Sequence, residues 1–138
     1  MLYSESLIIE QLTEKLLNLG YNVYSNFRYN GLEFDVLAIE HSKEFQRPMI
    51  HIFEVKVRAK SKIIDQIEKR LVLSDYLYVV IPYRLYPWIL KKINNLIGII
   101  IYKNDELYLF KPPIFIGNGY KVLNYIYTSS IEKSRNNM

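Results

Sequence analysis

The sequence predicts an α/β domain in which helices flank a mixed β-sheet, with the element order α-β-β-β-α-β-α-β-β. Three observations predict this class. Apolar residues recur at helical spacing in segments 5–19 and 61–73, and runs typical of strands lie between and after these segments. Short buried runs that directly follow helices also imply parallel crossover connections. We expect residues 1–128 to form one domain and residues 129–138 to form a flexible C-terminal tail.

Helical and strand-like patterns follow one another in a clear order. The expected elements are a helix at 5–19, strands at 22–29, 32–39 and 49–57, a helix at 61–73, a strand at 76–81, a helix at 88–95, and strands at 97–102 and 107–110. Ser4 or Ser6 can cap the first helix, and Gly20 stands where a helix-ending glycine belongs. Asn30-Gly31 is typical of a hairpin turn, so the first two strands are expected to pair antiparallel.

The later elements depend on buried runs and on prolines. Residues 49–57 are apolar on both faces apart from two charged positions, which is typical of a central strand. Pro82 ends the fourth strand, and Pro87 suits the first turn of the helix that follows. Residues 103–106 form a turn into the last predicted strand. Residues 120–127 fit either a strand or a helix.

The composition excludes several classes of chemistry. The 138 residues contain no cysteine, which excludes disulfides, zinc–thiolate sites and cysteine nucleophiles. No P-loop, G-x-G-x-x-G or G-x-S-x-G motif is present, which argues against ATPase, dinucleotide-binding and hydrolase-elbow functions. No apolar run approaches the roughly 20 residues that span a bilayer, and the N-terminus does not resemble a signal peptide. We therefore expect a cytoplasmic protein with no membrane partner.

Charge and tyrosine content leave the partners open. The formal net charge is +4 at pH 7, and 13 residues are tyrosine. AT-rich codons would account for the tyrosines, and so would a surface whose aromatic side chains stack on nucleic acid. The total charge is too small to decide between these alternatives.

Two opposite charges interrupt the third predicted strand. Glu54 and Lys56 project from the same face of residues 50–58, because side chains alternate along a strand. Burying an ionised group is costly unless it is paired or bound to a metal, and a cross-strand salt bridge would satisfy this requirement. Asp35 lies among apolar residues of the preceding strand. Antiparallel pairing of the two strands can bring all three charges to one face.

Converging carboxylates favour a divalent cation. Asp35 and Glu54 would repel each other at one point, and a bound cation is the usual resolution. Oxygen ligands in a chain without cysteine favour Mg²⁺ or Mn²⁺ over zinc. Lys56 could then orient or activate an attacking water and offset the charge of a phosphate.

This arrangement of an acidic residue on one strand, E-x-K on the next, and then a helix and a strand resembles the PD-(D/E)XK nuclease superfamily. The resemblance covers residues 5–110. Residues 31–35 (GLEFD) are similar to the glycine–acid–apolar–Asp motif of several branches, and residues 53–56 (FEVK) are similar to their E-V-K signature. The resemblance implies the restriction-endonuclease-like fold.

The same resemblance implies a Mg²⁺- or Mn²⁺-dependent DNA endonuclease. Asp35, Glu54 and the Val55 carbonyl would hold the metal, and Lys56 would be the catalytic lysine. Archaeal Holliday junction resolvases are small dimeric proteins built on this fold, so a homodimer acting on double-stranded or branched DNA is one expectation. A nicking nuclease, a repair nuclease and an exonuclease remain equally open.

Several further polar residues are candidates for the same site. Members of this superfamily often add a metal-binding glutamate on the first helix, and Glu5 and Glu10 are available. Glu5 lies on the inward apolar stripe and is favoured, whereas Glu10 is turned away from it. Glu33 shares a face with Asp35 but can equally be a rim charge. Some branches carry a glutamine in the following helix, where Gln66 stands, although a solvent-facing glutamine explains it equally well.

A run of positive charge follows the E-x-K triplet. It could bind DNA phosphates or simply form a solvated helix face. Its members are Arg58, Lys60, Lys62, Lys69 and Arg70. The pairs at 28–29 and 83–84 combine arginine with tyrosine and are weaker candidates of the same kind. The alternative to an enzyme is a catalytically inert nuclease-fold module that binds DNA or a protein.

Overall fold

The computed structural model describes the backbone of residues 4–136 and the side chains of residues 4–129. The elements are α1 (Glu5–Asn18), β1 (Asn22–Tyr29), β2 (Leu32–Glu40), β3 (Met49–Val55), α2 (Ser61–Glu68), the 3₁₀ helix η1 (Lys69–Leu73), β4 (Tyr76–Pro82), the 3₁₀ helix η2 (Tyr83–Leu85), α3 (Tyr86–Lys92), β5 (Gly98–Lys103), β6 (Glu106–Lys111) and α4 (Tyr120–Asn136). Apart from α4 and the two 3₁₀ helices, this is the predicted order of helices and strands.

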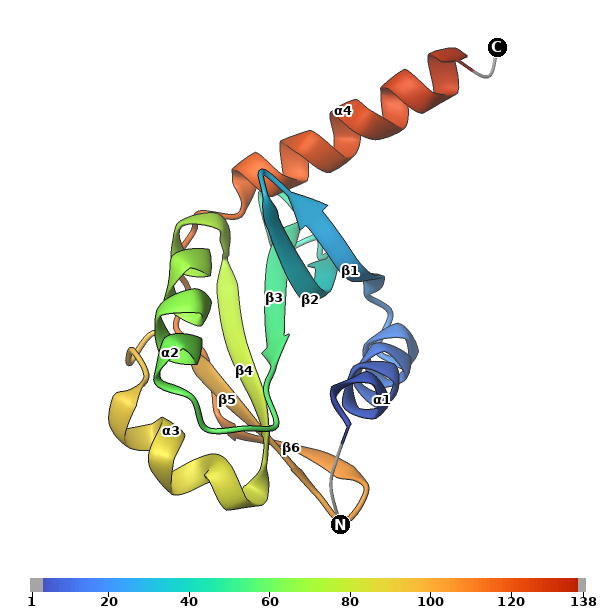
Figure 1. Ribbon diagram of the computed structural model, residues 1–138. Helices are drawn as coiled ribbons and strands as arrows, with labels where there is room; N and C mark the ends of the chain where they lie inside the picture. Colours follow the sequence, from blue (N-terminus) through green and yellow to red (C-terminus); the bar gives the residue numbers. More distant parts are fainter. Residues whose placement is uncertain (1–3, 137–138) are drawn as a thin grey trace.

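The strands form one six-stranded mixed sheet in the order β1-β2-β3-β4-β5-β6 (Figure 1). Strands β1, β2 and β3 pair antiparallel, β3, β4 and β5 pair parallel, and β6 returns antiparallel to β5. The parallel pairs are joined by the helical crossovers that the sequence predicts. The prediction of an α/β domain with a mixed sheet flanked by helices is therefore confirmed.

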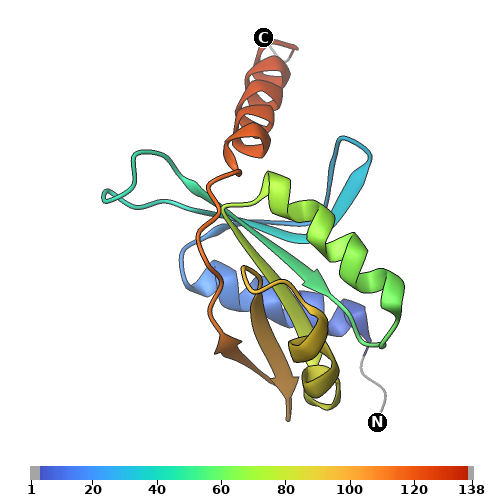
Figure 2. The ribbon, with the colours of Figure 1, turned by 90° about the vertical axis from the view of Figure 1, so that its left-hand side faces the viewer.

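Helices cover both faces of the sheet, so the core has two parts. We call the part beneath α1 the α1-side core; it contains Ile8, Leu12, Leu16, Val36, Ala38, Phe53, Val55, Tyr78, Val80, Ile100 and Tyr102. On the other face α2, α3 and the start of α4 cover the α2-side core, which includes Phe34, Leu37, Ile50, Ile52, Ile63, Ile67, Ile89 and Val122. Figure 2 shows α2 and α3 in front of the sheet and α1 behind it.

Local signals in the sequence correspond to the observed caps and turns. The Ser4 hydroxyl accepts a hydrogen bond from the backbone N–H of Leu7 at 3.1 Å, so Ser4 is the cap of α1. Gly20 has a φ of 93°, which glycine adopts readily just after a helix. Asn30 and Gly31 have φ values of 52° and 80°, as the hairpin between β1 and β2 requires.

The C-terminal segment continues as a helix, and the expectation that residues 129–138 form a flexible tail stays a prediction. Helix α4 runs from Tyr120 to Asn136, so residues 129–136 are helical, and residues 137–138 lie outside the described part of the chain. No proline or glycine interrupts this segment, which lets the backbone hydrogen bonds continue beyond the packed first turns. Figure 1 shows the far half of α4 projecting from the body of the domain.

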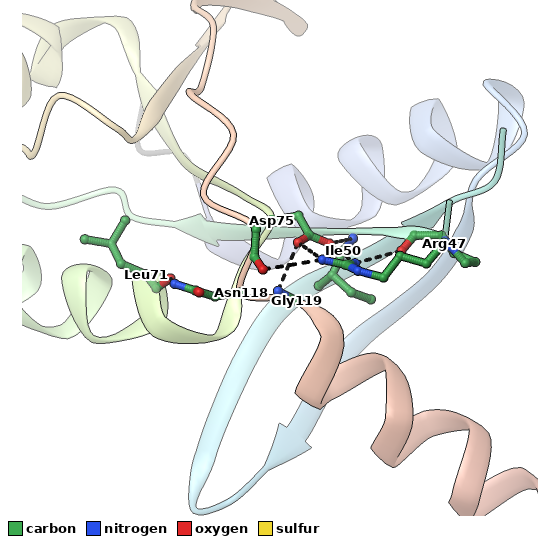
Figure 3. Close-up of polar contacts among 8 residues, drawn as sticks. Arg47, Ile50, Leu71, Asp75, Asn118 and Gly119 are labelled. Carbon is green, nitrogen blue, oxygen red and sulfur yellow. Dashed lines mark hydrogen bonds and ion pairs between the residues drawn. The ribbon is translucent and has the colours of Figure 1, made fainter. Parts of the chain in front are cut away.

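A buried carboxylate fastens the start of α4 to the sheet (Figure 3). The side chain of Asp75, which is 0% exposed, accepts hydrogen bonds from both terminal nitrogens of Arg47 at 2.7 and 2.6 Å. It also accepts the backbone N–H groups of Ile50 at 2.8 Å and Gly119 at 3.0 Å. The loop before β3, the start of β4 and the start of α4 therefore share one polar anchor.

The other differences are small shifts of element ends. The predicted helix at 61–73 divides into α2 and η1, and strand β3 ends at Val55 instead of residue 57. Helix α3 begins at Tyr86, with Pro87 in its first turn, instead of at residue 88. Within residues 4–136, no helix is long and apolar enough to cross a membrane.

Candidate active site

Asp35 and Glu54 meet where strands β2 and β3 stop pairing. The last backbone pair of this ladder is Val36–Phe53, and Asp35 and Glu54 are the next residues along. Beyond this last pair, the carboxylates of Asp35 and Glu54 connect the two strands by hydrogen bonds. The backbone N–H of Asp35 donates to Oε2 of Glu54 at 3.1 Å, and the N–H of Val55 donates to Oδ2 of Asp35 at 2.7 Å. The structure thus brings the two acids together, as antiparallel pairing of their strands predicts.

An irregularity in β1 accompanies this arrangement. Asn26 has a φ of 52°, and the regular pairing of β1 with β2 skips the Asn26–Asp35 pair. The alternation of β2 also breaks here, because Phe34 and Leu37 both join the α2-side core. Asparagine tolerates the left-handed region better than most residues. The regular strand expected at residues 22–29 did not include this feature, and its signal in the sequence is Asn26 itself in the middle of β1.

Arg70 is a buried partner of Glu54 and is not part of an exposed DNA-binding surface, which corrects its predicted placement. Its side chain is buried, and its Nε lies 3.1 Å from Oε1 of Glu54, forming an ion pair without the alignment of a hydrogen bond. One terminal nitrogen donates to the Glu33 carbonyl at 2.9 Å, and the other donates to the Gln66 carbonyl. Arg70 therefore links three elements beneath the carboxylate pair.

The inward position of Arg70 has a cause that the sequence contains. It follows the buried residues Ile63 and Ile67 by seven and three positions, which is the spacing of one helix face. The guanidinium also lies 5.9 Å from the ring centroid of Phe34. An arginine on an apolar helix stripe thus marks a buried ion pair, whereas its neighbour Lys69 is exposed.

Burial perturbs both carboxyl groups. Burial raises the pKa of Glu54 from 4.5 to about 7, and the charge of Asp35 adds to the rise, while Arg70 partly offsets it. Burial also raises the pKa of Asp35, against the opposing hydrogen bond from Val55 and the positive charge of Lys56. A desolvated pair of acids with raised pKa values is a frequent property of catalytic and metal-binding sites.

Lys56 follows the pair and lines an open cleft of about 620 Å³. Its backbone N–H donates to the Val80 carbonyl at 3.0 Å, which holds this part of the chain against β4. The cleft is lined by Ser4, Glu5, Ser6, Lys56, Val57, Arg58, Lys60 and Ile63. Asp35 and Glu54 are not among these described lining residues. The cleft therefore lies beside the strand ends that carry the two acids, and most of its charged lining residues are positive.

The remaining predicted residues divide between this cleft and the open surface. Glu5 is half-buried and shares the cleft with Lys56, whereas Glu10 is exposed on the outer side of α1. Lys62 and Lys69 are exposed, as are the side chains of Glu33 and Gln66. Their exposure leaves the two lysines free to contact a phosphate.

The described part of the chain contains no group of three or more histidine, cysteine, aspartate or glutamate residues arranged to hold a metal ion. The oxygen donors that lie close together are the carboxylates of Asp35 and Glu54, with the backbone of Val55 bonded to Asp35. Any further ligands would have to come from backbone carbonyls, water or substrate.

Comparisons with known proteins support the fold and leave the activity open. No protein-family model matches the sequence, and no curated protein matches it. A solved structure of a protein of unknown function from Silicibacter pomeroyi is similar, with a TM-score of 0.63 and 14% sequence identity over 92% of this chain and 86% of that chain. At this identity the likeness shows a shared fold alone.

Proposed function

We propose that this chain is a metal-dependent DNA endonuclease of the PD-(D/E)XK type, with a restriction-endonuclease-like fold. The observation that carries the proposal is the meeting of Asp35 and Glu54 at the point where β2 and β3 part, with Lys56 two residues further on. The topology supports it as well. An antiparallel β1-β2-β3 unit followed by a crossover to a parallel β4 is the order that the resemblance implies.

The donor chemistry at this point fits a hard divalent cation such as Mg²⁺ or Mn²⁺. Asp35 and Glu54 supply carboxylate oxygens, and the resemblance implies that the Val55 carbonyl would complete the set. Burial raises the pKa values of both acids, and the charge of Asp35 adds to the rise at Glu54; a bound cation would offset both effects by favouring the ionised forms. When bound there, the cation supplies positive charge against the charge that develops on a phosphate during hydrolysis.

Lys56 has the accessibility that its proposed role requires. Its side chain is half-buried and lines the cleft, so it can approach a phosphate oxygen or an attacking water in that cleft. A lysine ammonium there would orient the water and balance negative charge on the phosphate. The cations Arg58 and Lys60 in the same lining would hold neighbouring phosphates.

One observation favours a second candidate, an inert nuclease-fold module that binds DNA or a protein. Arg70 already neutralises Glu54 from below, as a structural ion pair would. A protein that keeps this pair only for stability has no need of a cation. The two candidates differ in whether Mn²⁺ binds and in whether DNA is cut.

A cleavage panel tests the proposal. The purified protein with Mg²⁺ or Mn²⁺ is expected to cut at least one of linear, nicked, flapped and four-way DNA substrates. Lys56→Ala should lower the rate by about 100-fold or more, as loss of a group that acts in the transition state does. Lys43→Ala, which removes an exposed lysine from the loop between β2 and β3, is the matched control and should not change the rate.

Calorimetric titration with Mn²⁺ separates the two candidates. The nuclease should bind Mn²⁺, and Asp35→Asn should weaken this binding while keeping an acceptor for the Val55 N–H. Absence of binding, or binding that Asp35→Asn leaves unchanged, would support the inert module. Cleavage that survives Lys56→Ala would contradict the proposed role of the lysine.

A further inference from the structure

A row of positive side chains lies at the carboxyl ends of the three parallel strands. Because β3, β4 and β5 are parallel neighbours, their carboxyl ends share one edge of the sheet, which is where ligands commonly bind in such sheets. Lys56 follows β3, Arg84 follows β4, and Lys103 ends β5. We call these three residues, with Arg58 and Tyr83, the strand-end surface.

Tyr83 is the aromatic member of this surface and is 54% exposed. The parallel pairing of Pro82 with Tyr102 places the next residues, Tyr83 and Lys103, side by side. The ammonium of Lys103 lies 4.4 Å from the centroid of the Tyr83 ring. This contact holds a large ring at the surface beside a cation, which is the combination that single-stranded nucleic acid binders use for stacking a base next to a phosphate.

Arg84 connects Tyr83 to the cleft at Lys56. Its guanidinium donates to the Val57 carbonyl at 2.8 Å, and Val57 lines that cleft. Positive charge therefore continues from the cleft to Lys103. In the described lining of the cleft, Glu5 is the one acidic residue.

We propose that the strand-end surface binds a single-stranded segment of DNA, with its phosphates along the cations and one unpaired base stacked on Tyr83. The inference rests on the proposed nuclease function and names its substrate class. A base inside a duplex is stacked on both sides and cannot lie on a protein ring without being extruded. Substrates with unpaired nucleotides, such as single strands, flaps and branched junctions, are therefore preferred over blunt duplex.

Binding without cleavage tests this proposal. Fluorescence anisotropy in EDTA compares a labelled single-stranded oligonucleotide with a blunt duplex of the same sequence. Tyr83→Ala should weaken single-strand binding by about 5- to 150-fold, the range that one base–aromatic stack provides, and should leave duplex affinity nearly unchanged. Tyr83→Phe keeps the ring and should restore binding.

Two further variants separate stacking from general charge effects. Tyr120→Ala is the matched control, because Tyr120 is 47% exposed and has the Lys121 ammonium 6.0 Å from its ring, but lies at the start of α4. It should bind single strands as the unmodified protein does. Lys103→Gln should reduce the slope of log K against log salt by about 0.7 for a single strand, as loss of one phosphate contact does.

The proposal is overturned if Tyr83→Ala leaves single-strand affinity unchanged, or if it lowers single-strand and duplex affinity equally. It is also overturned if neither DNA binds. Because the assay does not read cleavage, a protein that binds single strands through Tyr83 but never cuts DNA would keep this inference and lose the proposed catalytic function.

Discussion

Replacing Asp75 with asparagine is expected to destabilise the protein by about 3 kcal/mol, because it breaks a buried ion pair. Each carboxylate oxygen of Asp75 accepts one guanidinium N–H from Arg47 and one backbone N–H, from Ile50 or from Gly119. An asparagine side chain has a single acceptor oxygen. Its NH₂ group would face two donors whichever way the amide is turned.

The magnitude follows from the burial of the two partners. Removing one member of a buried ion pair costs about 3–5 kcal/mol, and each unsatisfied buried donor costs about 1–3 kcal/mol. Arg47 is 28% exposed, so water can solvate part of its guanidinium once the carboxylate is lost. The lower end of the range therefore applies.

The stability lost on replacing Asp75 with asparagine should depend on pH. Burial alone would raise the pKa of Asp75, but the hydrogen bonds from Arg47, Ile50 and Gly119 outweigh it, and the pKa lies below 3.8. A carboxyl whose folded pKa is lowered contributes stability that is present above its unfolded pKa and lost as pH falls through its folded pKa. The difference between the unmodified protein and Asp75→Asn should be full at pH 7 and shrink below about pH 4.

Urea unfolding followed by circular dichroism at pH 7 and pH 3 measures both effects. Asp65→Asn is the control, because Asp65 is an exposed acid on α2 and its replacement should change stability by less than about 0.5 kcal/mol. A loss below about 1 kcal/mol for Asp75→Asn would refute the reasoning. A loss of the same size at both pH values would refute the electrostatic part of it.

Three other changes follow from the structure. In EDTA the free energy of unfolding should fall by about 2–3 kcal/mol between pH 5 and pH 8, because the folded pKa of Glu54 is about 7, above its ordinary value of 4.5, and stability is lost as pH rises through it. Urea unfolding of Glu54→Gln should lack this pH-dependent component. If the unfolding free energies of the unmodified protein and of Glu54→Gln change with pH in the same way, the prediction is contradicted. Gly119→Ala places a Cβ 2.7 Å from Cβ of Ile50 and against the Asp75 carboxylate, so thermal unfolding should show a loss of about 1–3 kcal/mol, and an unchanged melting temperature would count against the tight contact. Ser4→Ala removes the cap of α1 and should cost about 1 kcal/mol in chemical denaturation, whereas Ser4→Asp should retain the stability if capping is the cause.

The local elements were predictable because their signals are local. The apolar stripe of α1 with Ser4 and Gly20 at its ends, and the Asn30-Gly31 turn, depend on the conformations of a few neighbouring residues. Side-chain alternation and antiparallel pairing likewise predict that Asp35 and Glu54 come together. These features need no knowledge of distant parts of the chain.

Other features of the candidate site could not be obtained in this way. Arg70 was counted with the surface cations, although its spacing from Ile67 places it on the buried face of α2 and η1. The sequence pattern does not reveal that the Glu54 carboxylate lies beneath that face and pairs with the buried charge of Arg70. The irregularity at Asn26 also depends on the partner strand, since its effect is the missing pair with Asp35.

The sequence by itself determined the order of helices and strands from α1 to β6, the hairpin turns, and the presence of two acids on adjacent strands with a lysine close behind the second acid. Only the tertiary structure decided that Glu54 pairs with Arg70, that Lys56 and Glu5 line one cleft, and that Asp75 fastens the start of α4 to the sheet. The physical reason is that backbone preferences and periodicity act over a few residues. Burial, pKa values and the partners of a charge are set by side chains that packing brings together from distant segments.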